Sequence, residues 1–178
     1  MSREGESRVA RAFVAEARAQ LAADYLPKIE RCLERLDDER LWWRPNEQSN
    51  SIGNLLLHLE GNARQWIVCG VGGATDRRVR DAEFAAREQL SRDELLARLR
   101  ATLAEVDAVL ARLDPATLLE ERRIQGLDVT CLRAVFHVVE HFSMHTGQII
   151  LLTKLLTGDD LAFYDFSAGK PRPNWKKQ

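Results

Sequence analysis

Hydrophobic residues recur along most of this chain at the three- and four-residue spacing of an α-helix, and the strict alternation typical of a strand is rare. The clearest stripe lies in residues 91–113, where Ser91 and Glu94 have the spacing of a capping box at a helix N-terminus. Asp114 and Pro115 follow the stripe and are expected to end the helix. Its apolar positions are Leu95, Leu99, Leu103, Val106, Leu110 and Leu113.

Three further segments, residues 9–36, 51–69 and 130–156, have the same helical pattern. Pro27 is expected to bend the first of these helices or to split it by a turn. Gly158 is expected to close the last one, because glycine readily takes the left-handed conformation that ends many helices. Four long helices without a convincing sheet predict an all-α fold, namely an up-down four-helix bundle.

The segments between the helices carry weaker signals. Residues 70–90 are expected to form a loop with partial structure, and the stretch around Gly126 a further connection. The tail, residues 166–178, is polar and contains proline, which predicts a surface strap around Trp175. The length predicts a single domain spanning residues 1–178.

Composition narrows the class of protein. The 178 residues are 45% hydrophobic and 30% charged, as in a globular domain, and a formal net charge of −1 gives no field that would attract nucleic acid. No apolar run approaches the roughly 20 residues that span a bilayer. The three cysteines form no C-x-x-C pair, and the charged N-terminus does not resemble a signal peptide. Together these features predict a cytoplasmic protein that binds neither nucleic acid nor membrane.

Three of the four histidines lie in the segment HVVEHFSMHTGQI. With about 100° per residue, His137 and His145 fall about 40° on either side of His141 on one helix face. The imidazoles of His141 and His145 can therefore converge and supply half of a metal site. The fourth histidine, His58, lies on a polar stripe beside the core face of its helix. The pattern is compatible with a solvent-facing position and with a wet pocket inside the bundle.

The side of residues 130–156 that lies opposite the histidines is also apolar. A helix that is apolar on nearly every side is buried on nearly every side, so we expect a second copy of the chain to cover this face in a homodimer. The residue 70–90 loop or the C-terminal strap could cover it instead. The residues of this face are Leu132, Val135, Phe136, Val139 and Ile150.

Three motifs together resemble the DinB/YfiT-like superfamily of bacterial four-helix-bundle proteins, within an uncharacterised branch. They are NSIGNLLLHLEGNARQWI at 50–67, RRVRDAEF at 77–84 and HFSMHTGQIILLTKLLTG at 141–158. Transferred residue by residue, the resemblance implies a divalent metal bound by His58, His141 and His145. Characterised members of the superfamily include S-transferases that use a thiol cofactor and a maleylpyruvate isomerase that uses mycothiol. His137 matches no ligand position of the superfamily.

Three neutral histidines leave a coordination position open, which is the pattern of a catalytic site. We therefore expect a metal-dependent transferase or hydrolase that acts on a small molecule, with zinc or nickel as the metal and a low-molecular-weight thiol as a candidate co-substrate. The alternative is a non-catalytic metal-binding module with a stress-response or structural role. The residues expected to orient the ligands or line the pocket are Asn54, Asn62, Gln65, His137 and Gln148.

The remaining chemical groups give no catalytic assignment. Glu60 and Glu140 point about 160° and 100° away from the neighbouring histidines and are expected to be solvated, so neither is named as a general base. The arginines of residues 77–80 are expected to form a solvated loop face paired with Asp76, Asp81 and Glu83. The less favoured alternative is that they guide an anionic substrate. Three tryptophans are expected to pack rather than to form a substrate cage: Trp42, Trp43 and Trp66.

Overall fold

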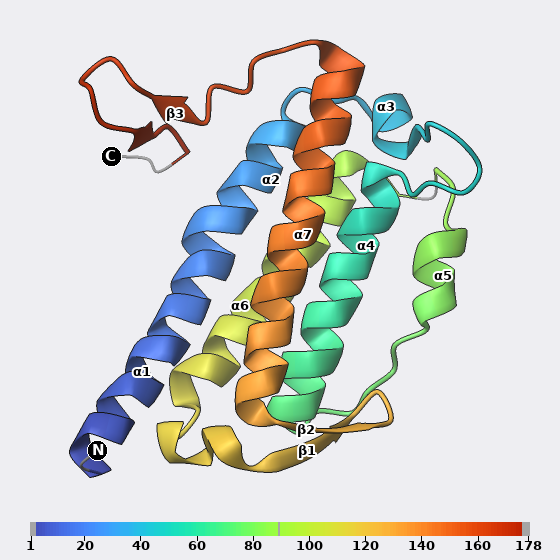
Figure 1. Cartoon of the computed structure of the whole chain (residues 1–178). Coiled ribbons are helices and arrows are strands. Elements are labelled where there is room, and N and C mark those ends of the chain that lie inside the picture. Colours follow the sequence, from blue (N-terminus) through green and yellow to red (C-terminus); the bar gives the residue numbers. More distant parts are fainter. Residues whose placement is uncertain (1–2, 89, 176–178) are drawn as a thin grey trace.

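The computed structural model describes residues 3–88 and 90–175, and in this part of the chain the long helices pack lengthwise against one another (Figure 1). The prediction of an all-α fold is confirmed. None of the described helices is long and apolar enough to cross a membrane. The long rods are α1 (Arg3–Ala19) continued by η1 (Gln20–Tyr25) and α2 (Leu26–Leu33), α4 (Ile52–Ala63) continued by η2 (Arg64–Val71), α6 (Arg92–Arg112) and α7 (Cys131–Thr157).

The first rod stays continuous at Pro27 because the helical turns before the proline are wider than those of an α-helix. The six residues before α2 form a π-helical stretch, and Pro27 occupies the first turn of α2. A proline ring clashes with the carbonyl four residues earlier and donates no hydrogen bond, so a wider turn ahead of it keeps the rod continuous.

The helix ends follow the capping signals of the sequence. The Ser91 and Ser51 side chains cap α6 and α4, and each takes part in a complete capping box, with Glu94 and Asn54 respectively. The Thr130 side chain caps α7. Gly158, at φ 70°, ends α7 in the left-handed conformation.

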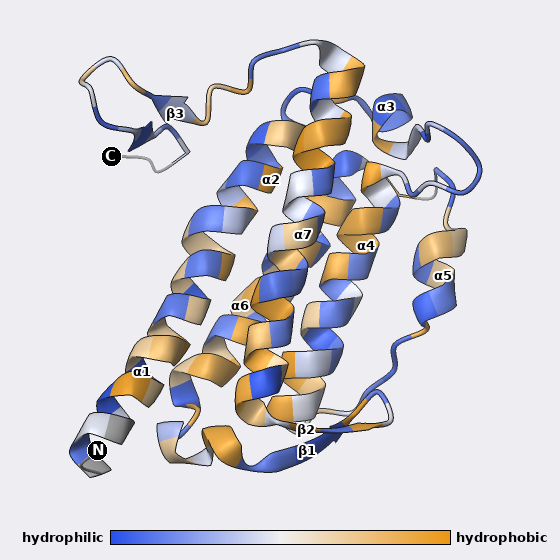
Figure 2. Ribbon diagram, viewed as in Figure 1, coloured by the Kyte–Doolittle hydropathy of each residue, from blue (hydrophilic) through white to orange (hydrophobic). Residues whose placement is uncertain are grey.

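The core lies where the long helices face one another, and Figure 2 shows hydrophobic residues concentrated on these inner faces. Phe142, on α7, is its largest fully buried side chain. Some hydrophobic residues of α7 lie outside the core: Phe136 is 47% and Leu132 is 38% exposed. Val135, which the sequence placed on the same outer face, is only 1% exposed and belongs to the core. Val139 and Ile150 are half-buried at the edge.

The connections hold more structure than the sequence indicated. The stretch around Gly126 is an antiparallel hairpin whose turn, Gln125–Gly126, has positive φ at both residues. Residues 73–79 have no regular secondary structure and lead to a short helix that lies beside α4 (Figure 1). The connecting elements are α3 (Asp38–Trp42), α5 (Arg80–Ala85), η3 (Pro115–Leu119), β1 (Glu121–Ile124) and β2 (Leu127–Thr130).

The C-terminal segment forms a second small hairpin, in which β3 (Tyr164–Asp165) pairs with β4 (Arg172–Pro173). Trp175 is 8% exposed, and the ammonium of Lys28 from α2 lies 4.3 Å from the centre of its ring. In the described part of the tail, the strap around Trp175 therefore packs on α2. Residues 176–178 lie outside the described part.

Candidate metal centre

Helices α4 and α7 bring three imidazoles together. The Nε2 atoms of His58 and His141 are 2.8 Å apart, and ring centres lie 4.4 Å apart for His141 and His145 and 5.2 Å for His58 and His145. One ring nitrogen from each of the three residues falls within 4.8 Å of the others. These are the three histidines for which the resemblance implied a metal site.

The side chain of His58 is buried and does not face solvent. His58 is 5% exposed, and the ring of Phe84, in α5, packs on it with centres 4.6 Å apart. The polar stripe of α4 is thus covered by a segment that follows about twenty-five residues later. His145 is 8% exposed, and His141 is half-buried.

The hydrogen bonds of His145 fit a metal ligand. Its Nδ1 lies 2.6 Å from Gln148 Oε1, and because a carbonyl oxygen only accepts, Nδ1 carries the hydrogen. The lone pair of the ring is then on Nε2, which is buried and has no hydrogen-bond partner in the described residues. A buried acceptor without a partner costs free energy, and a cation bound there would remove that cost. Gln148 thus contacts His145 directly.

Burial keeps the imidazoles of α7 neutral. It lowers the pKa of His141 to about 3, and the neighbouring imidazoles add to the effect. Burial likewise lowers the pKa of His145, although the hydrogen bond with Gln148 acts in the opposite direction. Neutral imidazole is the form that binds a metal, so these rings need lose no proton at neutral pH.

His137 lies beside the centre but is not one of the three converging residues. Asn62 Nδ2 donates a hydrogen bond to His137 Nε2 at 3.1 Å, and the ring stacks on Trp66 with centres 4.0 Å apart. Asn62 and His137, which the sequence indicated separately as orienting or pocket residues, thus form a neighbouring pair. The packing role expected for Trp42 and Trp66 is also observed, whereas Trp43 is 41% exposed.

Sequence reasoning paired Glu83 with the arginines of residues 77–80 but missed its contact with His58. Its Oε2 lies 2.9 Å from His58 Nδ1, and the Arg78 guanidinium binds both carboxylate oxygens at 2.7 and 2.8 Å. Burial acts to raise the pKa of Glu83, but the hydrogen bonds from Arg78 and His58 outweigh it and the pKa lies below its usual value. The prediction of a solvated loop face is wrong for Arg78, whose side chain is 5% exposed.

Asn54 and Gln65 hold backbone and side chains rather than line a pocket. Asn54 Nδ2 donates to the backbone carbonyls of Glu83 and Ala86, and Gln65 bonds Asp76 and Arg78. Both residues therefore fix the segment that carries Glu83. Only a contact between distant parts of the chain creates this arrangement, so no periodicity in the sequence could have indicated it.

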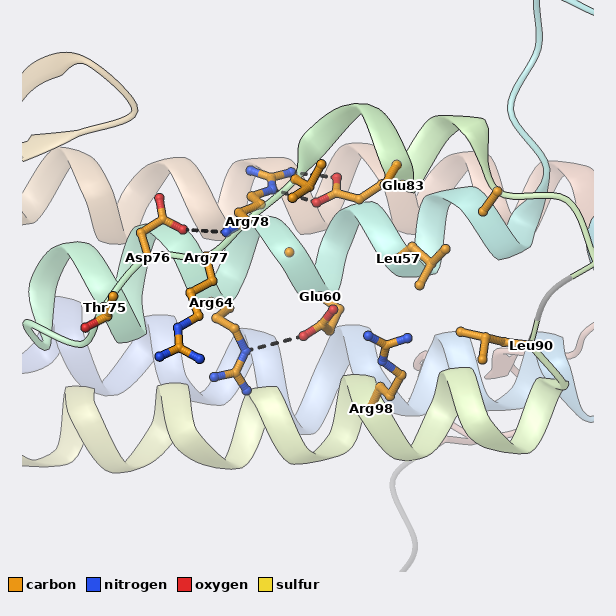
Figure 3. Close-up of a pocket in the computed structure, with 14 residues that line it drawn as sticks. Leu57, Glu60, Arg64, Thr75, Asp76, Arg77, Arg78, Glu83, Leu90 and Arg98 are labelled. Carbon is orange, nitrogen blue, oxygen red and sulfur yellow. Dashed lines mark hydrogen bonds and ion pairs between the residues drawn. The ribbon is translucent and has the colours of Figure 1, made fainter.

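A cavity of about 480 Å³ lies next to this centre, between α4, α6 and the segment before α5 (Figure 3). Arg78 and Glu83 form part of its wall, and no histidine is among its lining residues. Glu60 also lines it and contacts Arg64 and Thr102. The Arg78–Glu83 pair thus stands between this cavity and the imidazoles.

Comparison with known proteins identifies a solved structure with a similar fold and a matching family model. The crystal structure of a DinB-like protein from Bacillus cereus is similar to this chain, with a TM-score of 0.58, 17% sequence identity, and coverage of 74% of this chain and 85% of that one. The resemblance to the DinB/YfiT-like superfamily is therefore confirmed at the level of the fold. No curated protein matches the chain. A family model described as "Protein of unknown function (DUF1572)" matches residues 8–170, and the chain belongs to this family.

Proposed function

We propose that this protein binds one divalent metal ion through His58, His141 and His145. The observation that carries the proposal is the buried, unpartnered Nε2 of His145, in a cluster where the Nε2 atoms of His58 and His141 already face each other at 2.8 Å. Imidazole suits zinc and nickel, and these are the metals we expect. The DinB-like fold supports the assignment, since the sequence motifs of that superfamily imply the same three ligands.

We further propose that the metal serves catalysis of a transfer or hydrolysis reaction on a small molecule. Among the described residues, the cluster offers three protein ligands, whereas a structural zinc site is usually closed by four. A metal with an open position can lower the pKa of a bound water or thiol and create a nucleophile at neutral pH. A low-molecular-weight thiol is therefore the co-substrate to test first.

Elemental analysis of purified, dialysed protein tests metal binding. We expect one equivalent of metal per chain in the wild type and none in His145→Ala. His137→Ala is the matched control, because it removes an imidazole beside the cluster that is not one of the three converging residues; it should keep the metal. Equal metal content in wild type and His145→Ala would refute the ligand assignment.

The visible absorption spectrum of the cobalt-loaded protein separates catalysis from a non-catalytic, structural role. If a coordination position is open, adding 2-mercaptoethanol should produce a new absorption band from a cobalt–sulfur bond. A closed site leaves the spectrum unchanged, and the non-catalytic alternative then stands.

We also propose that two copies of the chain associate through the outer face of α7 in the cytoplasm. On that face, Leu132 and Phe136 are 38% and 47% exposed. Large exposed apolar side chains that share a helix face are typical of an interaction site. Sedimentation should show a dimer in the wild type and a monomer in Phe136→Glu; a monomeric wild type at micromolar concentration would exclude the dimer.

A further inference from the structure

The segment of residues 76–86 is fixed to α4 on both sides of His58. On one side, Gln65 Nε2 donates to Asp76 Oδ2 at 2.7 Å, and Gln65 Oε1 accepts from Arg78 at 2.9 Å. On the other side, Asn54 donates to the Glu83 carbonyl oxygen at 2.7 Å. The polar stripe of α4 is therefore the surface on which this segment docks.

Between these two attachments, Arg78 and Glu83 form a buried ion pair against α4. The side chains of Arg78, Glu83 and His58 are 5%, 10% and 7% exposed, and Figure 3 shows the Arg78 guanidinium meeting the Glu83 carboxylate beside α4. Removing two charges from water is costly unless their hydrogen bonds are satisfied. Arg78 satisfies both carboxylate oxygens, and the second bond of Oε2 goes to His58.

Gly61 provides the space for this pair. It lies one turn after His58, and a Cβ built on it would be 2.1 Å from Glu83 Oε1 and 2.9 Å from Arg78 Nε. Real Cβ atoms do not approach oxygen this closely, so any side chain at position 61 would push the carboxylate away from His58. The Arg78–Glu83 ion pair therefore requires a glycine at position 61.

The contact with Glu83 determines which nitrogen of His58 carries the hydrogen. An ionised carboxylate only accepts hydrogen bonds, so His58 donates from Nδ1 and its lone pair is on Nε2. Arg78 Nη2 is also 3.1 Å from Nδ1, but a guanidinium cannot accept and this group donates to Glu83 Oε2 at 2.8 Å. The lone pair of Nε2 then faces the other imidazoles, with His141 Nε2 2.8 Å away.

We propose that Glu83, held by Arg78 and given room by Gly61, is the positioning residue of the metal centre. It fixes the tautomer and the ring orientation of His58, so that Nε2 is preformed as a ligand. This inference rests on the proposed metal-binding function. Partners of this kind typically change metal affinity 10- to 100-fold when they are removed.

The tautomer can be measured on the metal-free protein by long-range proton–nitrogen NMR of the imidazoles. We expect the His58 ring to carry its hydrogen on Nδ1 in the wild type and to shift largely to Nε2 in Glu83→Ala. Glu83→Gln keeps a carbonyl acceptor and the side-chain size, so it should retain most of the wild-type signal. A wild-type ring protonated on Nε2 would overturn the inference whether or not the protein binds metal.

Zinc affinity, measured by competition with a chelating dye, is the second readout. Glu83→Ala and Gly61→Ala should each raise the zinc Kd about 10- to 100-fold. The matched control is Gly147→Ala in α7, where a Cβ would meet nothing within 4 Å, and its zinc Kd should equal that of the wild type. If Glu83→Ala fails to fold, Gly61→Ala decides the question.

The two proposals fail in different ways. A wild type that binds no zinc refutes the proposed function, and the tautomer measurement still judges the role of Glu83. A wild type that binds zinc with the same Kd as Glu83→Ala and Gly61→Ala leaves the metal site standing and refutes the positioning role.

Discussion

Replacing Asn54 by alanine removes the side chain that joins α4 to the segment carrying Glu83. Asn54 is fully buried; its Nδ2 donates to the backbone carbonyls of Glu83 and Ala86, and its Oδ1 accepts from the Ser51 backbone N–H and from Arg44. Alanine leaves the Glu83 carbonyl and the Ser51 N–H without a partner, at about 1–3 kcal/mol each, whereas the Ala86 carbonyl keeps its hydrogen bond from Arg87. The better helix propensity of alanine returns less than about 1 kcal/mol. We therefore expect a loss of about 1.5–5 kcal/mol in the free energy of unfolding.

Urea denaturation of the metal-free protein measures this loss, and hydrogen exchange locates it. Faster exchange should be confined to residues 76–86 and the start of α4. The matched control is Asn46→Ala, because the Asn46 side chain makes its hydrogen bonds in an exposed turn; its cost should stay below about 1 kcal/mol. If Asn54→Ala costs no more than Asn46→Ala, the reasoning that the buried amide holds the Glu83 segment is wrong.

Three further predictions concern the thiols, the core and the metal. Burial raises the pKa of Cys32 to about 11, so roughly one in a thousand of these thiols is ionised at pH 8. Ellman's reagent should therefore label half-buried Cys69 long before Cys32, and rapid labelling of Cys32 would contradict its burial. Phe142→Ala should cost about 3–5 kcal/mol in urea denaturation, against less than about 1 kcal/mol for exposed Phe166→Ala, and equal costs would disprove the assigned core. With zinc at about 100 times its Kd, stripping the metal with a chelator should lower the Tm of the wild type by roughly 5–10 °C and leave that of His145→Ala unchanged.

The sequence predicted what depends on neighbours along the chain. The cap at Ser91 and the glycine end at Gly158 are local hydrogen-bonding and backbone effects, and each is observed at the expected residue. The convergence of His141 and His145 follows from helical geometry alone. These features needed no knowledge of the tertiary structure.

What the sequence did not predict depends on residues that are distant along the chain. The pattern around His58 was compatible with solvent because its cover, Phe84 and Glu83, comes from a segment with weak helical signals of its own. Val135 looked like an outer-face residue because helix periodicity does not say how far neighbouring elements wrap around α7. The hairpin at Gln125–Gly126 was missed because its strands, four residues each, are too short to show a period.

X-ray absorption spectroscopy of the zinc-loaded protein tests the central claim most directly, because it reports the atoms that surround the metal. The account predicts three imidazole nitrogens at about 2.0–2.1 Å and one further light atom, with a sulfur at about 2.3 Å appearing when a small thiol is added. His58→Ala should lower the imidazole count by one or abolish binding. A spectrum with fewer than three imidazoles, or with cysteine sulfur before any thiol is added, would contradict the account.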